Sequence, residues 1–157
     1  MDYELFKQVL FDYTRKIGEN VNTYFQAIGV RYNLTMIQIR ILMELFHHET
    51  HTMGSLAERV HMAGANISTT CKKMEQRGLG KRTRDPVDER IVRIELTETG
   101  NLIMDEMNRM IDQAIKNALG RETAESQKTI IQGLTKFNEL LEQIINEQEI
   151  IWRGGKI

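Results

Sequence analysis

The chain has 157 residues, of which 41% are hydrophobic and 27% charged, and these are ordinary values for a soluble protein with one buried core. Its single cysteine excludes an internal disulfide or a zinc site built from several cysteines. No apolar run reaches roughly 18 residues and no signal sequence is visible, so we expect a cytoplasmic protein without a membrane span. The net charge of −1 argues against a histone-like, nonspecific polycation.

The first predicted element is an amphipathic helix from about residue 2 to residue 28. Apolar residues recur along it at helical spacing, and Gly29 is placed where the helix can end. Thr35 and Gln38 are spaced as a capping box, in which each side chain bonds the other residue's backbone N–H, and this box predicts the start of a second helix. The residues of that helix expected to face inward are Ile37, Ile41, Leu42 and Leu45.

Two short helices joined by a tight turn follow. Thr52 can cap the first, which carries Leu56, Ala57 and Val60. After the turn, the second short helix places its apolar residues on one stripe, and these are Ile67, Cys71 and Met74. Small polar and cationic residues occupy its opposite face, where they can reach base edges and phosphates. This pair of helices predicts a helix-turn-helix.

A basic β-hairpin is predicted next, with strands at residues 81–84 and 92–96 and a turn that starts at Asp85 and Pro86. Residues 72–93 contain eight Lys or Arg and four Asp or Glu, so this window carries +4 whereas the whole chain carries −1 and the remainder −5. A basic helix beside a basic hairpin indicates nucleic-acid binding. A solvated charged hairpin without a ligand is the alternative.

Two long helices are predicted at the end of the chain, from about Glu98 to Leu119 and from about Glu122 to Trp152. Residues spaced four, three, four and three apart form a coiled-coil seam in the second, namely Ile130, Leu134, Phe137, Leu141 and Ile144. A helix of roughly 30 residues extends about 45 Å, which is more than a small domain covers. A second copy of the chain is the simplest partner for this seam. An internal bundle with the first helix is the alternative.

Several motifs in the middle of the chain resemble the multiple-antibiotic-resistance-regulator (MarR) family of bacterial winged-helix transcription factors. The stretches that carry the resemblance are Asn33–Thr35, Ser55–Val60, Met74–Leu79, Arg82, Asp88 with Arg90, and Leu96–Gly100. The resemblance implies a mainly α fold with a small β-wing. In it, a winged helix-turn-helix at 31–97 is flanked by dimerisation helices at 1–30 and 98–157. It also implies a homodimer that binds a pseudo-palindromic operator in double-stranded DNA.

The same resemblance implies roles for single residues. The helix at 65–77 would enter the major groove, Arg90 at the wing tip would reach the minor groove, and Asp88 would hold the wing in shape. The predicted DNA-binding residues are Ala65, Asn66, Ser68, Thr69, Lys72, Lys73, Gln76, Arg82, Arg84, Asp88 and Arg90. The chain departs from the family pattern at Ala63, where a capping residue is common, at Thr69, where Arg is common, and at Gly80.

Family members mostly repress, and they release DNA when a small phenolic or lipophilic ligand, a metal or an oxidant alters the dimer. The polar residues expected in a ligand pocket are Tyr32, Arg40 and His47. Cys71 is interpreted as a small buried side chain, with a redox role as the alternative. His47, His48 and His51 lie near Glu44 in the sequence and are interpreted as exposed polar residues, with metal sensing as the alternative.

The sequence shows no phosphate-binding loop, nucleophile motif or paired carboxylates, so we expect neither an enzyme nor a cofactor. The leading hypothesis is a sequence-specific transcriptional regulator, in particular a repressor that a small ligand releases from its operator. The competing hypothesis is a winged-helix protein-interaction module whose basic wing binds an acidic protein partner.

Overall fold

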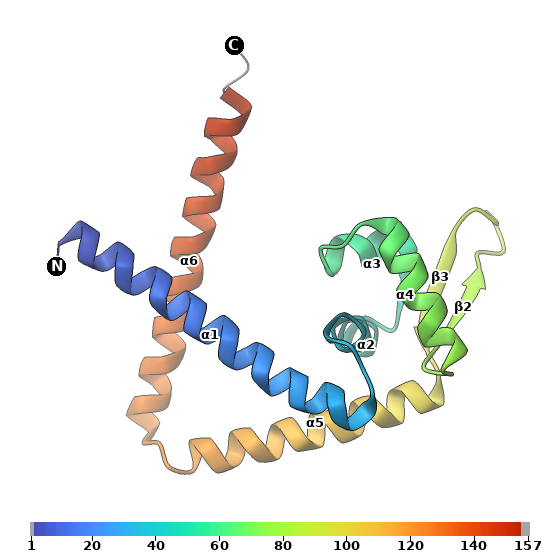
Figure 1. Ribbon diagram of the computed structural model, residues 1–157, viewed down its shortest axis with the longest axis horizontal. Coiled ribbons are helices and arrows are strands. Elements are labelled where there is room, and N and C mark those ends of the chain that lie inside the picture. The colour runs from blue at the N-terminus through green and yellow to red at the C-terminus, as the bar shows by residue number, and fades with distance from the viewer. Residues whose placement is uncertain (1, 155–157) are drawn as a thin grey trace. The chain divides into compact units, whose positions relative to one another are not determined.

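The computed structural model describes residues 2–154, which form six helices and one three-stranded antiparallel sheet (Figure 1). In chain order the elements are α1 (Tyr3–Tyr32), α2 (Met36–His48), β1 (Thr50–Thr52), α3 (Met53–Arg59), α4 (Gly64–Gln76), β2 (Gly80–Arg84), β3 (Val92–Leu96), α5 (Glu98–Leu119) and α6 (Ala124–Gly154). The predicted mainly α fold with a small β-wing is therefore confirmed. The chain divides into two compact units, Met1–Arg109 and Met110–Ile157. These units do not coincide with the functional division predicted at residues 31 and 98, which stays a prediction.

The end of α1 differs from the prediction. The helix continues through Gly29 to Tyr32, and Asn33 ends it in the left-handed conformation with φ 52°. Gly29 is buried, and a Cβ atom on it would lie 2.5 Å from the Leu34 carbonyl oxygen. Glycine at this position therefore allows the chain leaving the helix to pack closely against it, and the asparagine provides the stop.

The core of the first unit lies between α2, α3, α4 and the first half of α5. The capping box of Thr35 and Gln38 is present at the start of α2, and the Thr52 hydroxyl caps α3 by accepting the Ser55 N–H. The largest fully buried side chains are Ile39, Ile41, Leu42, Leu45, Leu56, Ile67, Met74, Ile94, Met104 and Met107. Ile37, which was expected inside, is only half-buried, and Ile39 on the same helix is buried instead.

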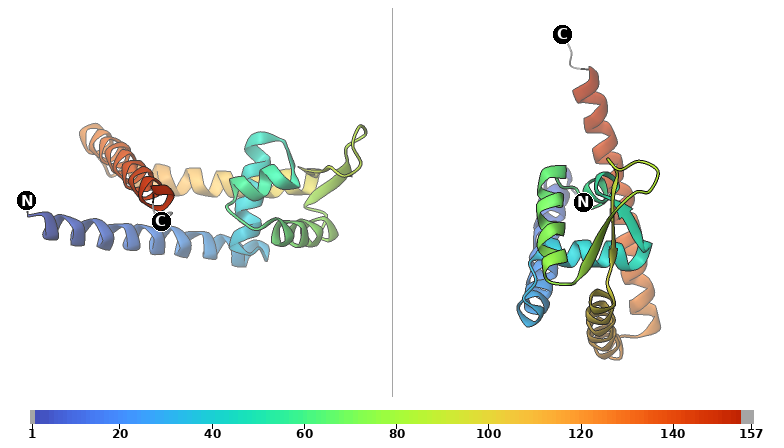
Figure 2. Two further views of the ribbon diagram at one scale, coloured as in Figure 1. Left: turned by 90° about the horizontal axis from the view of Figure 1, so that it is seen from above. Right: turned by 90° about the vertical axis from the view of Figure 1, so that its right-hand side faces the viewer.

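The sheet has the strand order β1–β3–β2, and β1 was not predicted. Its three residues pair with β3, for example His51 opposite Ile94. The hairpin of β2 and β3 has the register Gly80 opposite Leu96 and Arg84 opposite Val92. Figure 2 shows the loop of this hairpin extending away from the helices of the first unit.

A tight joint connects α4, the hairpin and α5. Gly78 adopts φ 69° after α4, and the Leu79 N–H returns to the Met74 carbonyl at 3.0 Å. The Thr97 hydroxyl donates to the Gly78 carbonyl and accepts the Gly100 N–H, so it caps α5 and binds the end of α4 at once. The joint therefore needs Gly78 for the left-handed turn, and it needs Gly100 for the close approach of α5, because a Cβ atom there would lie 2.1 Å from the Leu79 carbonyl oxygen.

In the second unit, α6 presents the predicted seam as an apolar face. Ile130 is 47% exposed, Leu134 50% and Ile144 38%, while Phe137 and Leu141 are half-buried. Exposed apolar residues recur along α1 as well, among them Leu5, Phe6, Val9, Tyr13, Ile17 and Val21. None of the helices in the described part of the chain is long and apolar enough to span a membrane.

Candidate nucleic-acid interface

Helix α4 separates its residues into a buried stripe and an exposed polar face. Ile67, Cys71 and Met74 are fully buried, as the spacing predicted. The exposed residues on the other side are Ala65, Asn66, Thr69, Lys72, Lys73 and Gln76, and Ser68 is half-buried at the edge. The predicted helix face is therefore formed as a continuous surface that contains two lysines and no acidic side chain.

Local hydrogen bonds restrict what this face can offer. The Thr69 hydroxyl donates to the Ala65 carbonyl at 3.1 Å, which leaves its lone pairs and its methyl group for a ligand. Ala63 precedes the helix without a side-chain cap, although its carbonyl accepts the Asn66 and Ile67 N–H groups. The N–H groups of Gly64 and Ala65, which precede these two, have no side-chain cap and can face an anion.

The tip of the wing is held by two aspartates. Asp85 Oδ1 accepts the N–H groups of Val87 and Asp88 at 2.9 and 3.3 Å, and its Oδ2 accepts the Arg93 Nε at 2.8 Å. These hydrogen bonds hold the pKa of Asp85 below its ordinary value. Asp88 accepts the backbone N–H of Arg90 at 3.0 Å, and its carboxylate lies 3.8 Å from the Arg90 guanidinium. The Arg90 side chain is 95% exposed, so the loop presents a cation to solvent.

Two other wing arginines are partly committed to the protein itself. Arg82 is half-buried. Its backbone N–H donates to the Glu75 carboxylate at 3.0 Å, and its guanidinium lies 3.8 Å from the same carboxylate. Arg82 therefore joins the wing to α4, and its predicted contact with DNA stays a prediction. Arg84 is exposed and donates to the Glu89 carbonyl at 3.2 Å, which leaves further donors of its guanidinium for a ligand.

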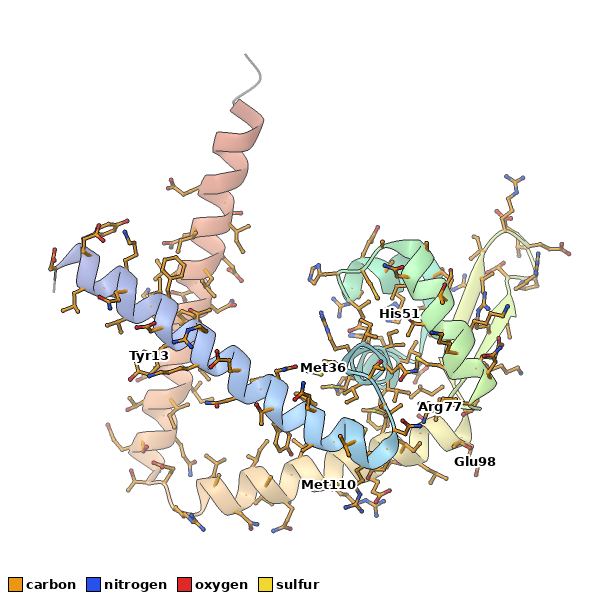
Figure 3. The ribbon with its side chains drawn as sticks, viewed as in Figure 1. Tyr13, Met36, His51, Arg77, Glu98 and Met110 are labelled. Atoms are coloured by element: carbon orange, nitrogen blue, oxygen red, sulfur yellow. The ribbon has the colours of Figure 1, made fainter. Side chains whose placement is uncertain are left out.

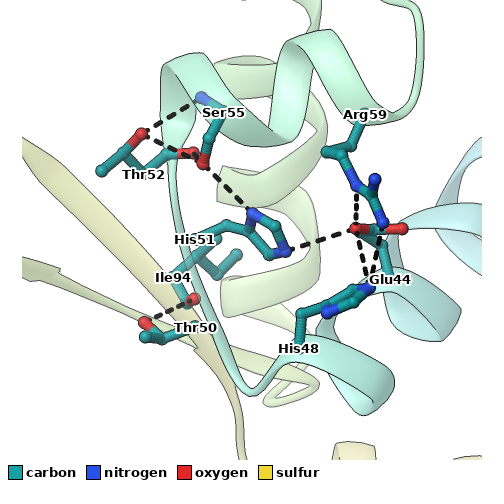
Figure 4. A network of polar contacts seen from close by, with 8 residues as sticks. All are labelled: Glu44, His48, Thr50, His51, Thr52, Ser55, Arg59 and Ile94. Carbon is teal, nitrogen blue, oxygen red and sulfur yellow. Dashed lines mark hydrogen bonds and ion pairs between the residues drawn. The ribbon is translucent and has the colours of Figure 1, made fainter.

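Of the three histidines near Glu44, His48 and His51 take part in a polar joint between α2, β1 and α3 (Figure 4). His47 and His48 are exposed, as interpreted, whereas His51 is half-buried. The Glu44 carboxylate accepts Arg59 Nε at 2.6 Å and lies 3.4 Å from His51 Nε2 and 3.7 Å from His48 Nε2. Burial is the largest single influence and would raise the pKa of Glu44, but the hydrogen bond and charge of Arg59, together with the charges of His48 and His51, lower the pKa overall. Among the side chains that the structure describes, which end at Glu147, no group of three His, Cys, Asp or Glu is arranged to hold a metal ion.

Cys71 lies inside the first unit, so its interpretation as a small buried side chain is confirmed. Burial raises the pKa of its thiol to about 11. Because the thiolate is the form that reacts with oxidants, a protonated and enclosed thiol is inert at neutral pH. The geometry thus disfavours the redox alternative at this residue.

A pocket of about 340 Å³ lies between α1 and α2. Its lining residues are Val21, Phe25, Met36, Ile39, Arg40 and Met43. Of the three residues predicted for a ligand pocket, Arg40 lines this one. Tyr32 lies at the end of α1, where burial and a hydrogen bond with Glu106 raise its pKa, and His47 is exposed with its ring against Phe46.

Together, α2, α3, α4 and the hairpin beside them form a winged helix-turn-helix, and the basic face of α4 and the wing defines the class of DNA-binding transcriptional regulators. Residues 23–107, more than half of the chain, match the family model described as transcriptional regulator SarA/Rot. The chain therefore belongs to the SarA/Rot family of transcriptional regulators.

Comparison with known proteins agrees with this assignment. The organic hydroperoxide resistance transcriptional regulator of Bacillus subtilis is 38% identical over 73 residues, which span 46% of this chain and 50%, or about half, of that relative. The structure of a MarR family protein from Bacillus stearothermophilus matches with a TM-score of 0.79 and 25% identity over 90% of this chain and 99% of that one. The predicted resemblance to the MarR family is thus confirmed.

Two further solved structures share the fold. Streptococcus pneumoniae FabT, solved in complex with DNA, has a TM-score of 0.76 and 19% identity over 88% of this chain and 99% of its own. NadR, solved in complex with 4-hydroxyphenylacetate, has a TM-score of 0.61 and 27% identity over 78% of this chain and 89% of its own.

Proposed function

We propose that this protein is a homodimeric repressor that binds a pseudo-palindromic DNA operator and releases it when a small aromatic or lipophilic acid binds. The observation that carries the DNA-binding part is the pairing of an exposed polar and cationic face on α4 with a wing tip that presents Arg90. A helix of this kind fits the major groove, and a two-stranded hairpin can reach the adjacent minor groove. FabT carries the same fold and was solved with DNA.

Different residues of this surface take different parts in the proposed complex. Asn66, Ser68 and Thr69 are short and polar and bond to base edges, while the small Ala65 lets the helix approach closely. Lys72 and Lys73, with Gln76 and Arg84, contact the phosphates and hold the register of the helix on the duplex.

Replacing both Lys72 and Lys73 by alanine should weaken binding to every duplex. Each lost phosphate contact should reduce the slope of log K against log salt by about one unit, because fewer counterions are released on binding. Fluorescence anisotropy titrations at several salt concentrations measure this slope, with Lys7→Ala on α1 as the matched control. A double variant with an unchanged slope would exclude phosphate contacts by α4, and a protein that binds no duplex would favour the protein-interaction module.

Arg90→Ala should cost about 1–3 kcal/mol of operator binding, the scale of a charged hydrogen bond, and should leave the fold intact because its side chain is exposed. The loss should shrink when the outer A·T pairs of the operator are changed to G·C, because a wider minor groove attracts arginine less. Asp88→Ala should cost less, since it only loosens the tip. Equal losses of Arg90→Ala on the two operators would show that Arg90 contacts a phosphate instead.

The effector part of the proposal rests on the pocket between α1 and α2. The surface of this pocket is almost entirely apolar, and its lining residues include the cationic Arg40 and no acidic residue. This lining suits a ring or alkyl chain whose carboxylate reaches Arg40. NadR, whose solved ligand is such an acid, supports this class of effector.

In the wild type, 4-hydroxyphenylacetate should displace operator DNA in a concentration-dependent manner, and its neutral amide analogue should act far more weakly. Arg40→Gln should keep operator affinity and lose the response to the acid, because the side chain keeps its reach but not its charge. Anisotropy of labelled operator measures both. An unaltered response in Arg40→Gln would place the effector elsewhere.

A further inference from the structure

Arg77 ends the recognition helix α4, and its guanidinium lies against the end of α1 (Figure 3). Its Nη1 donates to the Asn33 carbonyl at 2.6 Å and its Nη2 to the Tyr32 carbonyl at 3.0 Å. In the sequence this arginine counts towards the basic window around the wing. In the structure its two terminal nitrogens are directed at the protein backbone instead of a ligand.

The carbonyls that Arg77 binds belong to Tyr32, the last residue of the 30-residue helix α1, and to Asn33, the C-cap residue that follows it. Such carbonyls have no following turn to supply an N–H, and the negative end of the helix dipole lies there, so a cation with two donors is well matched to them. A lysine could not serve both carbonyls with the same fixed geometry, because only the guanidinium holds its donors in a planar fork.

The same end of α1 is also bonded to α5. Arg31 Nη2 donates to the Glu106 carboxylate at 3.1 Å, and the Tyr32 side chain hydrogen-bonds with that carboxylate as well. All of these residues belong to the first compact unit. The end of α1 is therefore a junction that connects α5 through Glu106 with the recognition helix through Arg77.

We propose that Arg77 is a positioning residue that fixes α4 relative to α1 and α5 and thereby sets the separation of the two operator half-sites that the dimer accepts. This inference rests on the proposed function, in which two recognition helices occupy major grooves roughly one helical turn, about 34 Å, apart. In the proposed dimer, one recognition helix is connected to its symmetry mate through the long helices. A stiff junction between α4 and these helices restricts the dimer to one spacing, and a loose junction tolerates several.

The test uses the full-length protein and an operator that the wild type selects from a pool of random duplexes. Two further duplexes carry one and two extra base pairs between the half-sites. Wild type, Arg77→Ala, Arg77→Lys and Lys73→Ala are titrated against all three at one salt concentration. Arg77→Ala should reduce the preference for the selected spacing by about tenfold, equivalent to about 1.4 kcal/mol. Arg77→Lys should fall between it and the wild type.

The matched control is Lys73→Ala on the same helix, which should weaken binding to all three duplexes equally and keep the spacing preference. The spacing preference is the ratio of the affinity for the selected duplex to the affinity for a duplex with extra base pairs, measured on one preparation. Partial unfolding of a variant lowers both affinities by the same factor and leaves this ratio unchanged. If Arg77→Ala kept the wild-type ratio, the inference would be wrong and the proposed function would stand, whether or not the overall affinity of the variant falls. A wild type that binds DNA without any spacing preference would overturn the proposed two-half-site function and the inference together.

Discussion

A variant with both Leu134→Asp and Leu141→Asp should be monomeric and should lose nearly all binding to a two-half-site operator. Leu134 is 50% exposed on α6 and Leu141 half-buried, and both lie on the apolar seam. Burying a leucine side chain against a partner contributes about 1.5–3 kcal/mol, and burying an unpaired carboxylate in its place adds a further penalty. Analytical ultracentrifugation measures the association, and anisotropy with half-site and full-site duplexes measures the binding.

The control for this variant places the same charges on the polar face of the same helix. Gln132→Asp combined with Thr135→Asp changes two exposed residues outside the seam and should leave both dimer and operator binding intact. A seam variant that sediments as a dimer would show that another surface joins the two copies. A monomer that binds the full operator as tightly as the wild type would show that DNA binding does not need the dimer.

Gly100→Ala should destabilise the first unit at or beyond the upper end of the about 1–3 kcal/mol that overpacking usually costs. The added Cβ would lie 2.1 Å from the Leu79 carbonyl oxygen and 3.2 Å from its carbon, and both are backbone atoms at the joint of α4 and the wing. Relief requires moving the start of α5, which would also break the bonds that Thr97 makes there. Urea denaturation followed by circular dichroism measures the loss.

Gly18→Ala is the matched control for this prediction. Gly18 lies inside α1 and has no atom within 4 Å of the Cβ position, so alanine should stabilise the helix by about 0.5–1 kcal/mol. If Gly100→Ala unfolded at the same urea concentration as the wild type, the close packing of α5 against Leu79 would not exist in solution.

A comparison of Gly78 with Gly29 shows which structural roles of a glycine cannot be predicted from the sequence. Gly78 follows α4 in a turn whose cause is local, because the chain turns back onto the Met74 carbonyl within five residues. Gly29 was taken for a stop although it is a contact site for the Leu34 carbonyl. The two look alike in the sequence, since only the path of the chain after α1 decides which atoms come near the glycine.

Strand β1 was not predicted, and the contacts of Glu44 were not foreseen, because both depend on partners from other segments of the chain. Three residues are too short to show an alternating pattern, and His51 becomes part of a strand only by pairing with Ile94, which is far along the chain. The nearest partner of Glu44 is Arg59 from α3, whereas the sequence pattern indicated exposed polar residues, with a metal site that includes the nearby histidines as the alternative.

The sequence by itself determined the elements whose causes lie within a few residues. The capping box at Thr35 and the buried stripe of α4 both follow from local periodicity and hydrogen bonding. Only the tertiary structure decided how the charges are used. Arg77 and Arg82 count equally with Lys72 in a sum of charges, but the fold directs Arg77 at the α1 carbonyls and Arg82 at Glu75. The physical reason is that a guanidinium bonds to whichever acceptors the packing of distant segments brings within its reach.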